Sequence, residues 1–281
     1  MPALLYLRQL SEDTMSIMNG KKGLIMGVAN ERSIAWGIAK TLYENGAQLA
    51  FSYQNEGFKK RLIPLMNTIK SDKHFECDVS KPATELNSIE NMFEKLSKAW
   101  NEIDFVVHAL AYSDKEELKG KYVNCSRENF LNSLDISAFS FTRIAKSSFP
   151  LMSLKGGSLL TLSYLGAERT TPNYNVMGVA KSALEASIKY LAMDLGKNNI
   201  RVNALSAGPV KTLAGAAISG ARHVFRYSED VAPLKFNPQL KEVGTAALYL
   251  TSELSSGVTG NVHHVDGGLH SVAIPKREDL E

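Results

Sequence analysis

The feature that most constrains the fold of this chain is an alternation of short, uninterrupted apolar runs with longer segments of helical periodicity. The alternation begins at Lys22 and continues almost to the end of the sequence. Apolar runs without an exposed polar face are typical of parallel strands that are covered on both sides. The predicted strands are residues 23–27, 47–53, 74–77, 104–110, 158–162, 200–205 and 261–265. The predicted helices are residues 33–43, 58–69, 83–100, 127–149, 174–195 and 243–251.

Strands separated by helices predict a single-domain α/β protein. We expect a Rossmann-like, doubly wound fold, in which helices cover both faces of a seven-stranded parallel sheet. The length of 281 residues fits one large domain of this type. We expect residues 1–19 to be a disordered N-terminal extension and residues 20–281 to form the domain. Residues 207–239 break the alternation with several glycines and prolines, and we expect them to be irregular.

Composition excludes several classes of protein. The net charge of +3 is small, and no run of like charge is long enough for a nucleic-acid-binding arm. No apolar run approaches the ~18 residues that a membrane span requires, and the N-terminal segment lacks the pattern of a signal peptide. The two cysteines, Cys77 and Cys125, have no metal-binding spacing. They favour a reducing compartment, so we expect a cytoplasmic protein without a metal site.

The turn after the first strand is a candidate dinucleotide site. Gly27 ends the strand, and Ser33 is a good N-cap for the helix that follows. The free N–H groups and partial positive charge of a helix N-terminus favour a phosphate. The glycine fingerprint of dinucleotide-binding folds is incomplete, because Ser33 and Ala35 stand where glycines are expected. An ordinary capped strand–helix turn is therefore the alternative.

The carboxyl ends of the next strands supply further candidates, since ligands of such sheets bind there. Gln54 follows the second strand, and its amide can bond a ribose hydroxyl but offers no charge to a 2′-phosphate. This favours NADH over NADPH, despite the basic residues 59–61. Asp78 and Val79 follow the third strand and are candidates for the adenine contact. Residues 110–113 follow the fourth strand, on the nicotinamide and substrate side. A helix cap after the third strand and core packing after the fourth are the alternatives.

Tyr174 and Lys181 form the most informative pair of side chains. They stand seven residues apart in a predicted helix, which places both on one face, roughly 10 Å apart along the axis. Lys181 also lies on the apolar stripe formed by Leu184 and Ile188, and a buried lysine requires a partner. A lysine that extends to the surface from the first turns is the alternative. A phenol beside an ammonium group is suited to stabilise an enolate.

The glycine turn, the helix with Tyr174 and Lys181, and residues 203–209 together resemble the short-chain dehydrogenase/reductase superfamily. The usual pattern there is Tyr-x-x-x-Lys with a serine upstream. In this chain Met177 occupies the usual tyrosine position and Tyr164 the usual serine position. The tyrosine stands at Tyr174, three residues before the usual position, which corresponds to ~4.5 Å along a helix axis. This shift suits 1,4-addition of hydride to an α,β-unsaturated thioester, because charge then develops on an oxygen further from the carbon that accepts hydride.

A closer resemblance narrows the family. Residues 34–37, 163–169 and 172–178 resemble bacterial NADH-dependent enoyl-acyl-carrier-protein reductases, enzymes of type II fatty acid synthesis. The likeness extends over residues 20–273. It implies that NADH delivers hydride to C3 of a trans-2-enoyl thioester, which gives the saturated acyl thioester.

The same resemblance implies a catalytic role for three side chains. Tyr174 would bond the thioester carbonyl and support the enolate. Lys181 would hold the hydroxyl groups of the nicotinamide ribose and lend positive charge. Tyr164 would lie beside the substrate and assist.

The resemblance also implies the remaining contacts. Cofactor contacts are expected at Gly27, Ser33, Ile34, Gln54, Asp78, Val79, Leu110, Lys181, Val210, Lys211, Thr212, Leu213 and Ala214. Substrate contacts are expected at Ser113, Tyr164, Tyr174 and Met177. The irregular region, about residues 207–239, would contain a mobile lid over the substrate. The partner would be acyl-carrier protein bearing a 2-enoyl chain, the assembly a homotetramer, and the place of action the bacterial cytoplasm, with no nucleic acid and no membrane.

Two other functions are compatible with parts of this pattern. An ordinary short-chain keto reductase or alcohol dehydrogenase would share the fold and the cofactor site. A non-catalytic dinucleotide-binding regulator would need the cofactor site but has no use for Tyr174.

Overall fold

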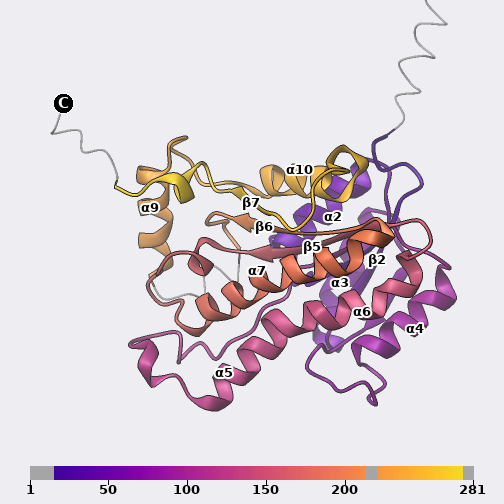
Figure 1. The fold of residues 1–281 in the computed structure, drawn as a ribbon, viewed down its shortest axis with the longest axis horizontal. Coiled ribbons are helices and arrows are strands. Elements are labelled where there is room, and N and C mark those ends of the chain that lie inside the picture. The colour runs from indigo at the N-terminus through magenta and orange to yellow at the C-terminus, as the bar shows by residue number, and fades with distance from the viewer. Residues whose placement is uncertain (1–15, 213–219, 275–281) are drawn as a thin grey trace, which may run out of the picture.

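A computed structural model describes residues 16–212 and 220–274 and shows one parallel sheet between two layers of helices (Figure 1). The strands are β1 (Lys22–Met26), β2 (Gln48–Tyr53), β3 (Lys73–Glu76), β4 (Phe105–His108), β5 (Gly157–Ser163), β6 (Ile200–Ala207) and β7 (Val262–Val265). Their spatial order is β3-β2-β1-β4-β5-β6-β7, and every neighbouring pair is parallel. The expected doubly wound, seven-stranded parallel sheet is thereby confirmed.

The strand order places the reversal of the chain between β1 and β4. From β1 the chain runs outward through β2 and β3, returns to β4, and runs outward on the other side through β5, β6 and β7. The carboxyl ends of β1 and β4 adjoin, with Met26 opposite His108. In such folds the loops diverge at this point, and the crevice between them receives the ligand.

Helices cover both faces of the sheet and bury its apolar strands (Figure 1). One face carries α2 (Ile34–Glu44), α3 (Glu56–Thr68) and α10 (Leu240–Thr251). The other face carries α4 (Ile89–Ala99), α6 (Ser140–Met152) and α7 (Val176–Leu195). Neighbouring strand residues alternate between the two layers, as the pleat of a strand requires. On β1, for example, Ile25 packs with the first layer and Leu24 with the second, and both are fully buried.

The long helix predicted over residues 127–149 is divided by a π-helical turn. The segment α5 (Arg127–Leu134) continues through the turn Asp135–Phe139 into α6. In this turn the hydroxyl of Ser137 accepts a 3.0 Å hydrogen bond from the Tyr112 N–H group and donates to the Tyr112 carbonyl at 3.2 Å. The π turn therefore fixes the segment that follows β4. Such turns inside α-helices often occur at functional sites.

One helix begins well after its predicted start, and one helix was not predicted. The helix predicted from residue 83 begins at Ile89, because the Ser88 hydroxyl accepts from the Asn91 N–H group and caps its first turn. Part of the region expected to be irregular is helical: α9 (Ala221–Val231) contains no glycine or proline. The neighbouring glycines and prolines concealed this helix in the sequence.

The folded domain begins earlier than the expected boundary at residue 20. Met18 is fully buried in the core, and its N–H group donates to the Asn45 carbonyl at 2.9 Å. Residues 16–19 therefore belong to the domain, whereas residues 1–15 lie outside the described residues. Across the two described ranges, no helix has both the length and the apolar character needed to cross a membrane.

Candidate active site

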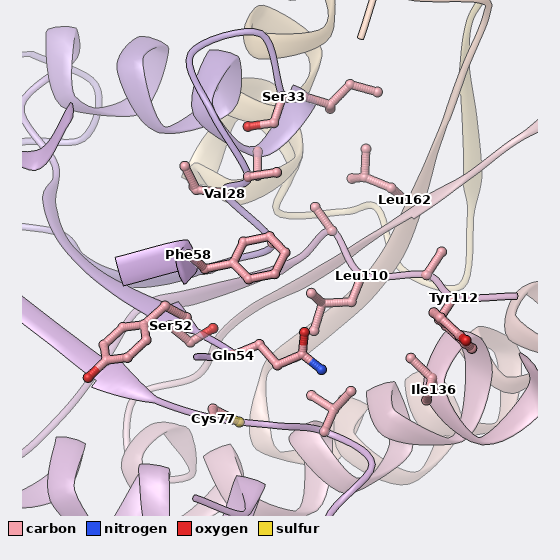
Figure 2. Close-up of a pocket in the computed structure, with 18 of the residues that line it drawn as sticks. Val28, Ser33, Ser52, Gln54, Phe58, Cys77, Leu110, Tyr112, Ile136 and Leu162 are labelled. Atoms are coloured by element: carbon pink, nitrogen blue, oxygen red, sulfur yellow. The ribbon is translucent and has the colours of Figure 1, made fainter. Parts of the chain in front are cut away.

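Two adjoining cavities open at the carboxyl ends of the strands. The larger has a volume of about 480 Å³ and is lined by the segments that follow β1, β2, β3 and β4. Figure 2 shows Val28 and Ser33 on one side of it, Gln54 and Cys77 on the opposite side, and Leu110 between them. The smaller has a volume of about 200 Å³ and is lined by the segments after β5 and β6, the turn before α7, and α9. The side chains that border both cavities are Ile34, Leu162, Lys181 and Thr212.

The turn after β1 brings backbone close to the larger cavity. Gly27 has a φ of +98°, and a Cβ atom there would lie 2.1 Å from the Ala109 carbonyl oxygen. Only glycine fits this position. Ser33 occupies the N-cap of α2 as predicted, but its hydroxyl donates to the Asn30 carbonyl at 2.7 Å instead of accepting from the helix. The amino end of α2 is therefore not capped by this side chain, and it faces the larger cavity through Ile34 and Ala35.

Gln54 and Asp78 are hydrogen-bonded to each other in the lining of the larger cavity, after β2 and β3. The Gln54 amide donates to the Asp78 carboxylate at 3.3 Å. The carboxylate also accepts from the Ser80 N–H group at 3.0 Å and from the Ser80 hydroxyl at 2.7 Å. Partial burial by itself raises the pKa of Asp78, but the bonds from Ser80 and Gln54 outweigh burial and hold that pKa below its ordinary value. An anionic carboxylate here disfavours a second anion such as a 2′-phosphate.

Two of the three basic residues at 59–61, Lys59 and Arg61, are engaged in other contacts. Lys59 pairs with Glu56 at 3.1 Å and lies 5.6 Å from the centre of the Tyr53 ring. Arg61 stacks over Phe58, and its side chain donates to the Gly57 carbonyl at 3.2 Å. These contacts reduce the positive charge available to a 2′-phosphate.

Lys181 is buried at the junction of the two cavities. Its ammonium group donates to the Leu162 carbonyl at 2.7 Å. Burial lowers the pKa of Lys181 to about 8, while the negative charge of Glu185 acts in the opposite direction. Glu185 stands one turn further along α7 and accepts a hydrogen bond from the Ser163 hydroxyl. The predicted alternative of a lysine that extends to the surface is wrong, because Lys181 is only 5% exposed.

Tyr164 and Tyr174 lie in contact in the lining of the smaller cavity. Their rings meet edge to face with centroids 5.0 Å apart. Burial raises the pKa of Tyr174 well above its ordinary value, and the negative charges of ionised Tyr164 and of Glu185 act in the same direction. Burial also raises the pKa of Tyr164, against a hydrogen bond with Thr171 that lowers it. Both phenols therefore keep their protons at neutral pH and can donate hydrogen bonds.

Tyr174 does not lie on the helix, contrary to the prediction. Helix α7 begins at Val176, and Tyr174 stands between Asn173 and Asn175, which have positive φ angles of 59° and 38°. Asparagine tolerates such angles better than most residues, and they interrupt the helix. The axial distance expected from a shared helix face therefore does not apply. The Tyr174 phenol reaches the cavity from a turn, while Lys181 reaches it from the helix.

Most of the predicted site residues line a cavity. The larger cavity is lined by Gly27, Ser33, Ile34, Gln54, Asp78, Val79, Leu110, Lys181 and Thr212. The smaller cavity is lined by Tyr164, Tyr174, Lys181, Val210 and Thr212. Leu213 and Ala214 lie outside the described residues.

Three predicted residues line neither cavity. The Ser113 hydroxyl donates to the Asn129 side chain at 3.2 Å. Met177 is buried with its sulfur 3.8 Å from the Ser137 hydroxyl, so its place in the first turn of α7 directs it into the protein. Lys211 is exposed.

Several lining residues were not predicted. Phe58, Ile136 and Leu162 contribute to the larger cavity, and Val224 and Phe225 of α9 to the smaller, whereas Tyr112 of the larger cavity belongs to the predicted residues 110–113. Leu162 carried a usable signal, because it lies at the carboxyl end of a predicted strand. Phe58 and Ile136 carried none, since apolar residues inside helices usually belong to a core. Val224 and Phe225 lie in the region 207–239, which is expected to be irregular and to contain the lid, but nothing in the sequence singles them out.

The chain resembles known proteins over most of its length. The family model described as "Enoyl-(Acyl carrier protein) reductase" matches residues 27–270. A curated relative from Rhizobium meliloti, "Enoyl-[acyl-carrier-protein] reductase [NADH] 1", is 54% identical, over 92% of this chain and 93% of its own length.

Solved structures agree with this similarity. The enoyl-(acyl-carrier-protein) reductase of Anaplasma phagocytophilum, solved in complex with NAD, is 51% identical with a TM-score of 0.88, over 94% of this chain and 97% of that one. FabI from Candidatus Liberibacter asiaticus is 52% identical with a TM-score of 0.90, over 94% of this chain and 100% of that one.

Proposed function

This chain belongs to the enoyl-(acyl carrier protein) reductase family, and from that premise we propose how its residues carry out the reaction. The chain is an NADH-dependent oxidoreductase that reduces the double bond of an enoyl thioester in fatty acid synthesis. The observation that carries the assignment of roles is that two partly buried phenols and one buried ammonium group line the smaller cavity, beside the larger one.

The larger cavity fits NADH in shape and chemistry. Gly27 packs so closely against the Ala109 carbonyl that no Cβ atom fits, and the backbone of this turn lines the cavity, where a pyrophosphate can approach it. The amino end of α2 provides partial positive charge beside it. Gln54 and Asp78 offer hydrogen-bond partners to the adenosine, whereas the carboxylate disfavours a 2′-phosphate. We therefore propose that the cofactor contacts predicted from the sequence are made by the residues that line this cavity.

The smaller cavity fits the thioester end of the substrate. When bound, NADH supplies the hydride that adds to C3 of the enoyl group. Tyr174 donates a hydrogen bond to the thioester oxygen, where negative charge develops, and its raised pKa keeps the proton in place for this role. Tyr164 packs against Tyr174 and restricts the position of its ring. Lys181 holds the ribose hydroxyls at the junction and lends positive charge to the developing anion.

We propose further that α9 covers the acyl chain, since Val224 and Phe225 line the smaller cavity with apolar surface. This helix belongs to the region predicted to act as a lid. The substrate is presented by acyl-carrier protein, in the bacterial cytoplasm where its NADH supply lies.

We also propose a homotetramer. Large apolar side chains are exposed on one side of the molecule, along α5, the π turn and α7. They are Leu131, Phe139, Tyr190 and Met193, with exposed fractions of 46%, 54%, 77% and 84%. Exposed apolar groups in such a row mark a protein interface. A second copy of the same face is its natural partner, and two such dimers would associate into the tetramer.

The reaction is tested with purified protein, NADH and two short thioesters. A trans-2-enoyl thioester should cause steady loss of NADH absorbance, and a 3-oxoacyl thioester should cause none. The opposite result would favour an ordinary keto reductase. Binding of NADH without turnover of either thioester would favour a non-catalytic regulator. Repeating the assay with NADPH measures the selectivity that Asp78 implies.

A further inference from the structure

Arg143 reaches from α6 to the turn that forms the adenosine end of the larger cavity. Its side chain is 15% exposed and donates from one terminal nitrogen to the Val79 carbonyl at 2.8 Å. The other terminal nitrogen donates to the Lys81 carbonyl at 2.8 Å. Val79 lines the cavity, and Lys81 ends the turn that contains it. One guanidinium group therefore holds two carbonyls of a single turn.

Glu90 fixes the guanidinium group in this orientation. Its carboxylate accepts from Arg143 twice, at 2.9 Å and 3.3 Å, in the parallel arrangement that planar guanidinium and carboxylate groups favour. Glu90 stands in the first turn of α4, where the helix dipole also favours an anion. Arg143 thus connects α4, α6 and the turn after β3.

The turn held by Arg143 carries the polar groups that would meet adenosine. Asp78 precedes Val79, and its carboxylate is oriented within the same turn by Ser80 and Gln54. The main-chain N–H group of Asp78 donates to the Asn87 carbonyl at 2.8 Å, which fixes the start of the turn. The later part of the turn, from Val79 to Lys81, is held in place beside the cavity by its hydrogen bonds with Arg143.

We propose that Arg143 is a positioning residue for the adenosine end of NADH: it holds the turn at residues 78–81 so that Asp78 and Val79 meet the cofactor. Arg143 lines neither cavity, so it acts through the turn and not by contact with the ligand. The inference rests on the proposed use of NADH. It predicts that loss of Arg143 weakens recognition of adenosine and leaves the chemistry at the nicotinamide end unchanged.

The test compares NADH with reduced nicotinamide mononucleotide, which carries the nicotinamide, its ribose and one phosphate but no adenosine. In Arg143→Gln, kcat/KM for NADH should fall roughly tenfold because KM rises while kcat stays the same. The value of kcat/KM for the mononucleotide should not change. Arg143→Lys should recover part of the loss, because an ammonium group can hold one carbonyl. An equal fall for both reductants, or a fall in kcat at unchanged KM, overturns the proposal.

The chain offers a matched control. Arg201 is also partly buried and donates to the carbonyls of Leu250 and Ser252, at 2.9 Å and 3.0 Å, but it lies at the amino end of β6, away from both cavities. Arg201→Gln should leave KM for NADH unchanged. If KM rose as much as in Arg143→Gln, loss of any partly buried arginine would have this effect, and the proposal would be overturned.

Two further arms keep the test decisive. If Arg143→Gln does not fold, Glu90→Gln replaces it. It removes the carboxylate that orients the guanidinium group but leaves Arg143 itself, so KM for NADH should rise by less; unchanged KM overturns the proposal. If the unmodified protein fails to use NADH at all, the proposed function fails, which is a different result from normal NADH use with no effect of Arg143.

Discussion

The ammonium group of Lys181 donates a 2.7 Å hydrogen bond to the carbonyl oxygen of Leu162. Leu162 belongs to β5 and Lys181 to α7, and both residues border the two cavities. The bond holds the cation at the point where the two cavities meet. It uses one of the three donors of the ammonium group, so two are left for the hydroxyls of a ribose.

Lys181→Ala should therefore weaken binding of NADH on the order of 10- to 100-fold, since hydrogen bonds from a charged group are lost. Titration of NADH by fluorescence measures this. Lys189→Ala is the control, because Lys189 is exposed on the same helix. Unchanged affinity in Lys181→Ala would disprove the ribose contact.

The low pKa of Lys181 predicts an alkaline limit of activity. With a pKa of about 8 in the folded protein, the ammonium group loses its proton as pH rises through that value. Log kcat/KM for NADH, which reports the free enzyme, should therefore fall above about pH 8. Glu185→Gln removes a charge that raises this pKa, so the fall should begin at lower pH. A profile that is flat to pH 10 would contradict this role.

The same shift affects stability. Below pH 8 the lysine is charged in both the folded and the unfolded protein. Between pH 8 and the ordinary lysine value of 10.5, the unfolded chain binds a proton that the folded protein does not. Stability contributed by this group should therefore rise with pH across that window. Urea unfolding across this window should show wild type gaining stability with pH relative to Lys181→Ala; a difference between the two proteins that does not change with pH would show that the shift is absent.

Tyr174→Phe should lower kcat on the order of 100-fold, because the donor to the developing oxyanion is removed. Affinity for NADH should not change, since Tyr174 does not line the larger cavity. Tyr164→Phe should lower kcat less. Steady-state kinetics with a 2-enoyl thioester and NADH titration separate the two effects; equal loss in both variants would contradict the assignment of roles.

Gly166→Ala tests the position of the phenol without removing it. A Cβ atom at Gly166 would lie 2.4 Å from Cδ1 of Tyr174, so the ring has to move. We expect kcat to fall while NADH affinity is kept. Gly257→Ala is the control, because no atom lies within 4 Å of the position of its added Cβ. Normal turnover in Gly166→Ala would show that the ring position is not critical.

The proposed tetramer predicts that charge on the exposed apolar row breaks the assembly. Tyr190→Glu combined with Met193→Glu should reduce the molar mass found by light scattering. Leu154→Glu should not, although Leu154 is 100% exposed, because it lies in the turn after α6 and outside the row. A variant that keeps the mass of the wild type would place the interface elsewhere.

The sequence was informative where local pattern decides structure. The apolar runs predicted all seven strands, and hence the edge at which the cavities open. Ser33, Gln54 and Asp78 follow those strands directly, so their placement at the larger cavity followed from topology.

Other parts of the site depend on contacts that local pattern does not contain. The turn that carries Tyr174 requires positive φ at two asparagines, whereas the surrounding residues favour a helix. Met177 has the right position in the sequence for the substrate but is buried by packing against α5 and the π turn. Arg143 meets Val79 across 64 positions of sequence, and nothing near either residue indicates it.

The wall shared by the two cavities has a kinetic consequence. Ile34, Leu162, Lys181 and Thr212 border both spaces, so a molecule in the larger one completes the boundary of the smaller. The thioester then finds its full binding surface only after the reductant is seated. We therefore expect ordered addition of the two substrates, with the reductant first and the oxidised dinucleotide as the last product to leave.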